Sequence, residues 1–131
     1  VWLSIQLINL GSGNPVAMCV SDSTSPTLTY NATETSMEGT SASPLMVCSS
    51  EGSQNVRKYS KYYSVSGVMG VAPSAVQSEN NFSSLISDNP ASQGYLHIQT
   101  ESLNSTSTNV LMICQLTYNC EFYQSEEVPP S

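Results

Sequence analysis

The chain has 131 residues, of which 39% are apolar and 8% aromatic, so it is long enough for one domain with a hydrophobic core. Only 10% of the residues are charged, against about 25% in an average domain, and Ser and Thr are abundant; this balance favours β-strands and loops over exposed helices. The formal net charge is −7 and the only cations are Arg57, Lys58 and Lys61, which excludes a surface that neutralises a row of phosphates.

The apolar start of the chain, residues 1–10, lacks the basic flank and the small-residue cleavage site of a signal peptide. No stretch reaches the roughly 18 apolar residues that cross a bilayer, so we expect no membrane span. The first residue is Val rather than Met, which indicates a processed or truncated chain.

Two strands are predicted near the N-terminus. In residues 1–7 every odd position is apolar, which is the period-2 pattern of a strand with one buried face. Residues 16–20 alternate in the same way and lead into the turn-rich residues 21–26. Ser25 before Pro26 resembles a helix N-cap followed by Pro at the first helical position, so we expect one short helix within residues 26–38 that stops at Gly39.

Three further strands are predicted in the middle of the chain. Residues 44–48 are a short apolar run, residues 57–65 carry three tyrosines that suit a pleated surface, and residues 94–100 alternate again. Residues 67–90 are rich in Gly, Pro, Ser and Asn, so we expect a long excursion with local turns there.

The last and longest strand is predicted over residues 110–122. Its even positions are apolar without exception, so we expect that face to pack into the core. The prolines of the tail, residues 126–130, cannot continue a ladder. Six strands, one helix and no composition break predict a single all-β domain over residues 1–131, an antiparallel β-sandwich.

The four cysteines allow two interpretations, reduced thiols or disulfides. Cys114 and Cys120 lie about 20 Å apart on one predicted strand, which is too far for a bridge, and both occupy apolar-face positions. We expect reduced thiols that fill the core. A disulfide framework remains open because the number of cysteines is even, and a Cys19–Cys48 bridge would fit a secreted protein with glycosylated Asn31, Asn81 and Asn104.

Catalytic chemistry has little support. His97 is the only histidine and no C-x-x-C spacing occurs, which excludes the common zinc sites. A serine, His97 and either Asp22 or Asp88 would supply the parts of a triad, but no nucleophile motif is present, and we expect His97 to be a solvent-facing or interface residue. No enzyme is expected.

Asp22 is the one candidate metal ligand. It follows a predicted strand in a segment rich in oxygen ligands, as a calcium site requires. The alternative is that its side chain caps its own turn.

The order of these features resembles part of a known fold family. Residues 15–22 (PVAMCVSD), Pro26, a Thr-rich helix and Pro44, followed by residues 57–63 (RKYSKYY), Asn89-Pro90, residues 94–98 (GYLHI) and residues 116–122 (LTYNCEF), are similar to the shell-domain jelly roll of sobemovirus, tombusvirus and nodavirus coat proteins. Ser25 stands where the family's calcium loop carries a second acid after Asp22. Six strands are fewer than the eight of a jelly roll, so the resemblance implies its C-terminal part.

The resemblance implies a structural capsid protein that self-assembles into an icosahedral virion shell in the host cytoplasm. Its partners would be copies of itself, other capsid chains and a host receptor, with residues 21–43 and 67–90 making contacts. Genome RNA would be bound mainly by a basic segment absent from this sequence, and an interface calcium would lie at Asp22. The first strands would belong to a preceding segment or to a separate chain. A secreted or surface β-sandwich that binds a glycan or a protein receptor is the alternative.

Overall fold

The computed structural model describes residues 1–11, 14–38, 41–49, 55–85, 87–104 and 107–121. Six strands and three short α-helices lie in this part of the chain, with a 3-10 turn at Asn80–Phe82. Their bounds, in chain order, are β1 (Trp2–Asn9), β2 (Val16–Ser23), α1 (Ala32–Glu38), β3 (Met46–Cys48), β4 (Val56–Tyr62), α2 (Val65–Met69), α3 (Pro73–Ser78), β5 (Tyr95–Ser102) and β6 (Val110–Thr117).

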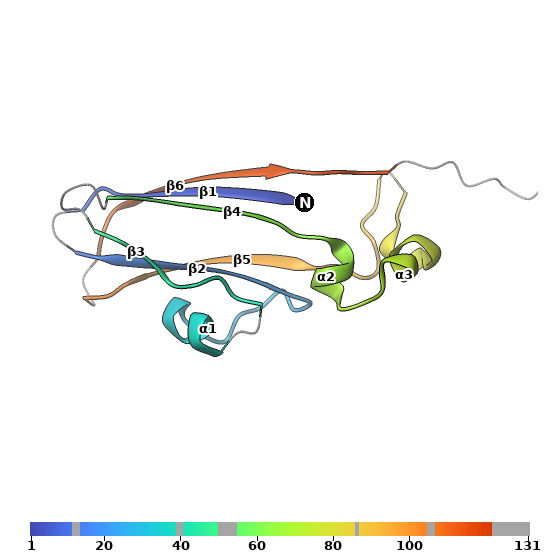
Figure 1. Ribbon diagram of the computed structural model, residues 1–131, viewed down its shortest axis with the longest axis horizontal. Helices are drawn as coiled ribbons and strands as arrows, with labels where there is room; N and C mark the ends of the chain where they lie inside the picture. Colours follow the sequence, from blue (N-terminus) through green and yellow to red (C-terminus); the bar gives the residue numbers. More distant parts are fainter. Residues whose placement is uncertain (12–13, 39–40, 50–54, 86, 105–106, 122–131) are drawn as a thin grey trace, which may run out of the picture.

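The strands form two antiparallel sheets of three strands each. Sheet A has the order β4-β1-β6 and sheet B the order β3-β2-β5. Figure 1 shows the two sheets as separate layers, with α1 beneath sheet B and with α2 and α3 at the end where β4 finishes and β5 starts. The expectation of a mostly β chain built as an antiparallel sandwich is therefore confirmed at this level.

The core lies between the two central strands. In β1 the odd positions Leu3, Ile5 and Leu7 are at most 1% exposed, and in β2 the even positions Val16, Met18 and Val20 are at most 3% exposed. Alternation along each strand sends these side chains to one face of each sheet. Both faces of β2 are buried, because α1 packs on the outer face of sheet B.

Helix α1 begins at Ala32, six residues later than Pro26. Asn31 Oδ1 accepts the backbone N–H of Glu34 at 2.8 Å, and Glu34 Oε2 accepts the N–H of Asn31 at 3.2 Å, which is a reciprocal capping box. Ser25 Oγ instead accepts the N–H of Thr27 within the preceding turn. The predicted start was therefore wrong because a second capping signal lay downstream, and the predicted stop at Gly39 falls outside the described residues.

The segment after β4 is more regular than the sequence indicated. The strand ends at Tyr62, and Ser64 caps α2 by accepting the N–H of Gly67 at 3.0 Å. Pro73 stands at the first turn of α3, where its missing N–H costs nothing. Residues 67–90 were expected to form a long excursion with local turns, and they contain most of α2, all of α3 and the 3-10 turn.

Asn9 fixes the sharp exit from β1. Its side chain is 3% exposed, and its Nδ2 donates to the carbonyls of Asn14 at 2.7 Å and Cys48 at 3.1 Å. Its Oδ1 accepts the N–H of Gly11 at 2.9 Å. These bonds satisfy a buried amide fully and tie the β1–β2 turn to β3.

Candidate functional site

One side of the sandwich is joined across the two sheets. On this side, the closed flank, β3 of sheet B contacts both β4 and β1 of sheet A. Arg57 Nε on β4 donates to the carbonyl of Val47 on β3 at 2.6 Å. Because β4 and β3 lie on the same side of the central strands β1 and β2, β6 and β5 lie together on the other side, which we call the open flank.

The inward-facing side chains of β6 are only half covered. Met112, Cys114 and Leu116 stand directly opposite Leu7, Ile5 and Leu3 of β1, so they share the inner face of sheet A. The three β1 residues are at most 1% exposed, whereas Met112 is 43% and Leu116 44% exposed, and Cys114 is also exposed.

This result corrects the prediction that the even face of residues 110–122 packs into the core. The side chains point inward as expected, but no described element covers them on the open flank. The strand is also shorter than predicted, because it ends at Thr117; Cys120 is exposed beyond it, and Phe122 and the tail lie outside the described residues.

The outer face of β6 is apolar as well. Leu111 is 46% and Ile113 52% exposed on this face. On the same outer face, Trp2 of β1 and Tyr62 of β4 form a separate aromatic pair beside the Thr117 end of β6, with ring centroids 6.4 Å apart. The sequence of β6 is therefore typical of a strand buried on both faces, although the described residues bury neither.

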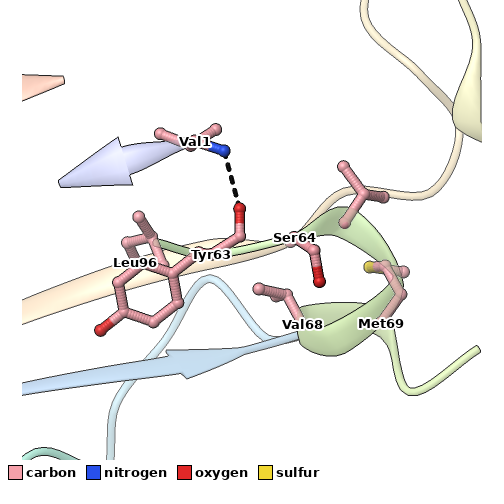
Figure 2. A pocket seen from close by; sticks show the side chains of 8 residues that line it. Val1, Tyr63, Ser64, Val68, Met69 and Leu96 are labelled. Atoms are coloured by element: carbon pink, nitrogen blue, oxygen red, sulfur yellow. Dashed lines mark hydrogen bonds between the residues drawn. The ribbon is translucent and has the colours of Figure 1, made fainter. Parts of the chain in front are cut away.

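A hollow lies at the end of the sandwich where the chain enters β1. It is lined mainly by apolar side chains from the start of β1, the end of β4, α2 and the start of β5 (Figure 2), namely Val1, Tyr63, Ser64, Val65, Val68, Met69, Gly94 and Leu96. The backbone nitrogen of Val1 donates to the carbonyl of Tyr63 at 2.7 Å. A Cβ on Gly94 would stand 2.6 Å from Val68 Cγ1, so glycine is needed where α2 meets the start of β5.

Tyr63 is the most perturbed titratable group near this hollow. Its ring is 5% exposed, and its hydroxyl forms a 2.9 Å hydrogen bond with that of Tyr59. Burial, followed by the contact with Tyr59, raises the pKa of Tyr63 well above its ordinary value of 10.0. Tyr63 therefore stays neutral and acts as a structural residue.

The structure separates His97 from Asp22 of the hypothetical triad, whereas Ser23 Oγ lies 3.3 Å from His97 Nε2. His97 stands opposite Ser21 on the outer face of sheet B, whereas Asp22 stands opposite Leu96 on the inner face. His97 Nε2 lies 2.9 Å from the carbonyl of Ser25, and since a carbonyl only accepts, Nε2 carries the proton. Its ring also stacks on Tyr95, which is consistent with a surface residue that fixes the loop after β2.

Asp22 does not lie in a loop. Strand β2 continues to Ser23, so Asp22 is a half-buried residue within the strand. The turn that follows is held by Ser23, whose Oγ accepts the N–H of Ser25 at 2.9 Å. Among the described residues no group of three or more His, Cys, Asp and Glu side chains is placed to hold a metal ion, and calcium at Asp22 stays a prediction.

All four cysteines are free thiols. Cys48 stands opposite Val16 and shares its inner face, whereas Cys19, an odd number of residues further along β2, points to the outer face. Burial raises the pKa of the Cys19 thiol, which reduces its reactivity. The two buried thiols therefore fill space on opposite sides of sheet B and do not form the Cys19–Cys48 bridge, while the core position predicted for Cys114 and Cys120 was wrong.

Sequence reasoning found the strands of the open flank but missed that they lack cover. The three sequon residues Asn31, Asn81 and Asn104 are exposed, and Asn31 is used as a helix cap. No helix in the described ranges is long and apolar enough to cross a membrane.

No known protein family, curated protein sequence or solved structure was found to match the chain.

Proposed function

We propose that the chain is the C-terminal part of a jelly-roll coat protein that assembles with copies of itself into an icosahedral shell. The observation that carries this proposal is the strand order. An eight-stranded jelly roll is a long hairpin wrapped into two sheets, in which the first strand pairs with the eighth, the second with the seventh, the third with the sixth and the fourth with the fifth. Its sheets have the orders 1-8-3-6 and 2-7-4-5.

Removing the first two strands from that scheme leaves two three-stranded sheets. Renumbered from the third strand, their orders become 6-1-4 and 5-2-3, which are the orders of sheet A and sheet B. Each of the four antiparallel pairings of this chain agrees with the scheme. The same order supports the resemblance to coat-protein shell domains.

Surface properties favour a structural role for this jelly roll. The outer face of sheet A carries two half-exposed apolar pairs at opposite ends, Trp2 with Tyr62 and Leu111 with Ile113, and exposed apolar groups of this kind favour contacts with other proteins. In a symmetric shell many copies repeat the same weak interface, so modest patches suffice. The net charge of −7 leaves genome RNA to a basic segment elsewhere in the coat protein.

Electron microscopy and light scattering of the full-length coat polypeptide test this proposal. We expect closed spherical particles that contain many copies of the chain. A preparation that is folded but strictly monomeric over a wide range of protein concentration and salt would remove the capsid role.

A secreted or surface β-sandwich that binds a glycan or a receptor is the second candidate, favoured by the exposed sequon residues Asn31, Asn81 and Asn104. Mass spectrometry of protein from the native source separates the two candidates. Attached glycans on these residues would support the secreted candidate and contradict assembly in the cytoplasm, whereas unmodified asparagines with four free thiols would remove it.

A further inference from the structure

We infer that the open flank is closed by a two-stranded β segment that precedes Val1 in the same polypeptide, with one strand pairing with β5 and the other with β6. The inference rests on the jelly-roll proposal and names the partner of the surface that β5 and β6 expose. Its experiment is chosen so that it can fail while the coat-protein role stands.

The pairing pattern identifies which part of the polypeptide supplies the strands. Around the β2–β3 connection the chain folds as a nested hairpin, because β2 pairs with β3 and, one step further out, β1 pairs with β4. The next strand outward on the C-terminal side is β5, whose counterpart is the strand before β1. The counterpart of β6 is the strand before that one.

Both strands of the open flank have a free edge, and β6 also has uncovered apolar side chains on its inward face. β5 and β6 are eight residues long, and each is hydrogen-bonded to a neighbour on one side only among the described strands. The inward-facing Met112 and Leu116 remain more than 40% exposed, and β6 carries no charge, proline or bulge to protect its edge. An apolar edge of this kind is an aggregation hazard unless another strand covers it.

The direction of the chain agrees with this arrangement. Val1 and the first residues of β5 line the same hollow, so β1 and β5 both start at this end of the sandwich. A strand antiparallel to β5 runs toward that end and finishes beside Val1, from which the chain passes directly into β1. The nested pairing relates strands of one polypeptide to each other. We therefore assign the cover of the open flank to a segment of the same polypeptide and not to a second copy of this chain.

Thiol labelling tests this inference because Cys114 lies on the inward face of β6. In the full-length polypeptide, dissociated to monomers, we expect Cys114 to react with a maleimide roughly a hundredfold more slowly than in urea, since labelling then requires local opening. Cys19 on β2 and Cys48 on β3 are buried, so their protection from labelling reports that the protein is folded. Peptide mass spectrometry resolves the three sites.

Specific cleavage just before Val1, followed by separation of the released segment, is the matched comparison. We expect Cys114 to become reactive while Cys19 and Cys48 stay protected. If Cys114 in the intact monomer reacts as fast as in urea while the other two stay protected, the flank is open and the inference is wrong.

The inference would also be wrong if the protection of Cys114 disappeared on dilution or survived removal of the segment. In either case a second copy of the chain would cover the open flank. Particle formation is scored on the same samples. A polypeptide that forms shells but has a reactive Cys114 after dissociation would remove only the flank inference. A polypeptide that never forms shells but has a protected Cys114 would remove only the capsid role.

Discussion

On the inner face of sheet A, the central strand β1 and the edge strand β6 of the open flank differ in cover and not in apolar character. Leu7 on β1 and Met112 on β6 stand opposite each other on the same face of sheet A, yet Leu7 is 0% exposed and Met112 is 43% exposed. β1 has neighbours on both sides and β2 beneath it, whereas β6 has one neighbour. Burial in a sandwich is therefore decided by which strands surround a residue, and alternation in the sequence decides only which way the residue points.

The largest expected effect comes from truncating these two residues. Leu7→Ala leaves a cavity in the centre of the core and should lower the free energy of unfolding by about 2–5 kcal/mol. Met112→Ala removes a half-exposed side chain and should cost less than about 1 kcal/mol in the 131-residue chain. Urea unfolding followed by circular dichroism measures both.

The same pair sharpens the flank inference. In the longer polypeptide that carries the preceding strands, the cost of Met112→Ala should rise toward that of Leu7→Ala, because the side chain is then covered. Equal costs of Met112→Ala in the short and the long chain would contradict the proposed cover of β6.

A smaller effect on the free energy of unfolding is expected from pH, because the phenol of Tyr63 is buried. The pKa of Tyr63 is raised by burial, so above pH 10 the unfolded chain releases a proton that the folded chain keeps. The stabilising contribution is complete below pH 10 and is lost as the pH rises further, by up to about 1.4 kcal/mol per pH unit.

Urea midpoints between pH 8 and pH 11 test this effect. Tyr63→Phe should flatten the fall above pH 10, whereas Tyr62→Phe, at the adjacent residue that is 50% exposed, should leave it in place. The comparison uses the slopes, because Tyr63→Phe also removes the hydrogen bond to Tyr59 at every pH. Identical slopes in the two variants would refute the assignment to Tyr63.

Four of the six strands were predicted from the sequence because a period of two survives in them, and residues 44–48 and 57–65 were identified by a short apolar run and by tyrosines that suit a pleated surface. All six predicted runs overlap an observed strand, and the boundaries differ by a few residues at the ends. The open flank was not readable, since the pattern of β6 is the same whether its partner strand is present or absent. Cys114 was therefore assigned the correct face of the strand and the wrong environment.

The helices and the metal candidate show a different limit. Two capping signals competed for α1, and the Asn31–Glu34 pair prevailed over Ser25-Pro26 because its side chains bond reciprocally to the backbone. The signals for α2 and α3 were present, with Ser64 at the N-cap of α2 and Pro73 at the first position of α3, but helices of five and six residues are too short to show a periodic pattern. Asp22 was placed in a loop because the alternation of β2 becomes polar before the strand ends.

A further small effect on stability concerns the hydrogen bond that joins the two sheets on the closed flank. Arg57→Met keeps the aliphatic stem but removes the donor to the Val47 carbonyl, and should cost about 1 kcal/mol in the free energy of unfolding. Lys58→Met, one residue along β4 and on its other face, is the matched control that also removes one positive charge. If the two variants lose equal stability, the loss comes from charge, and the closure of this flank rests on the packing of β3 against β4 and β1 alone.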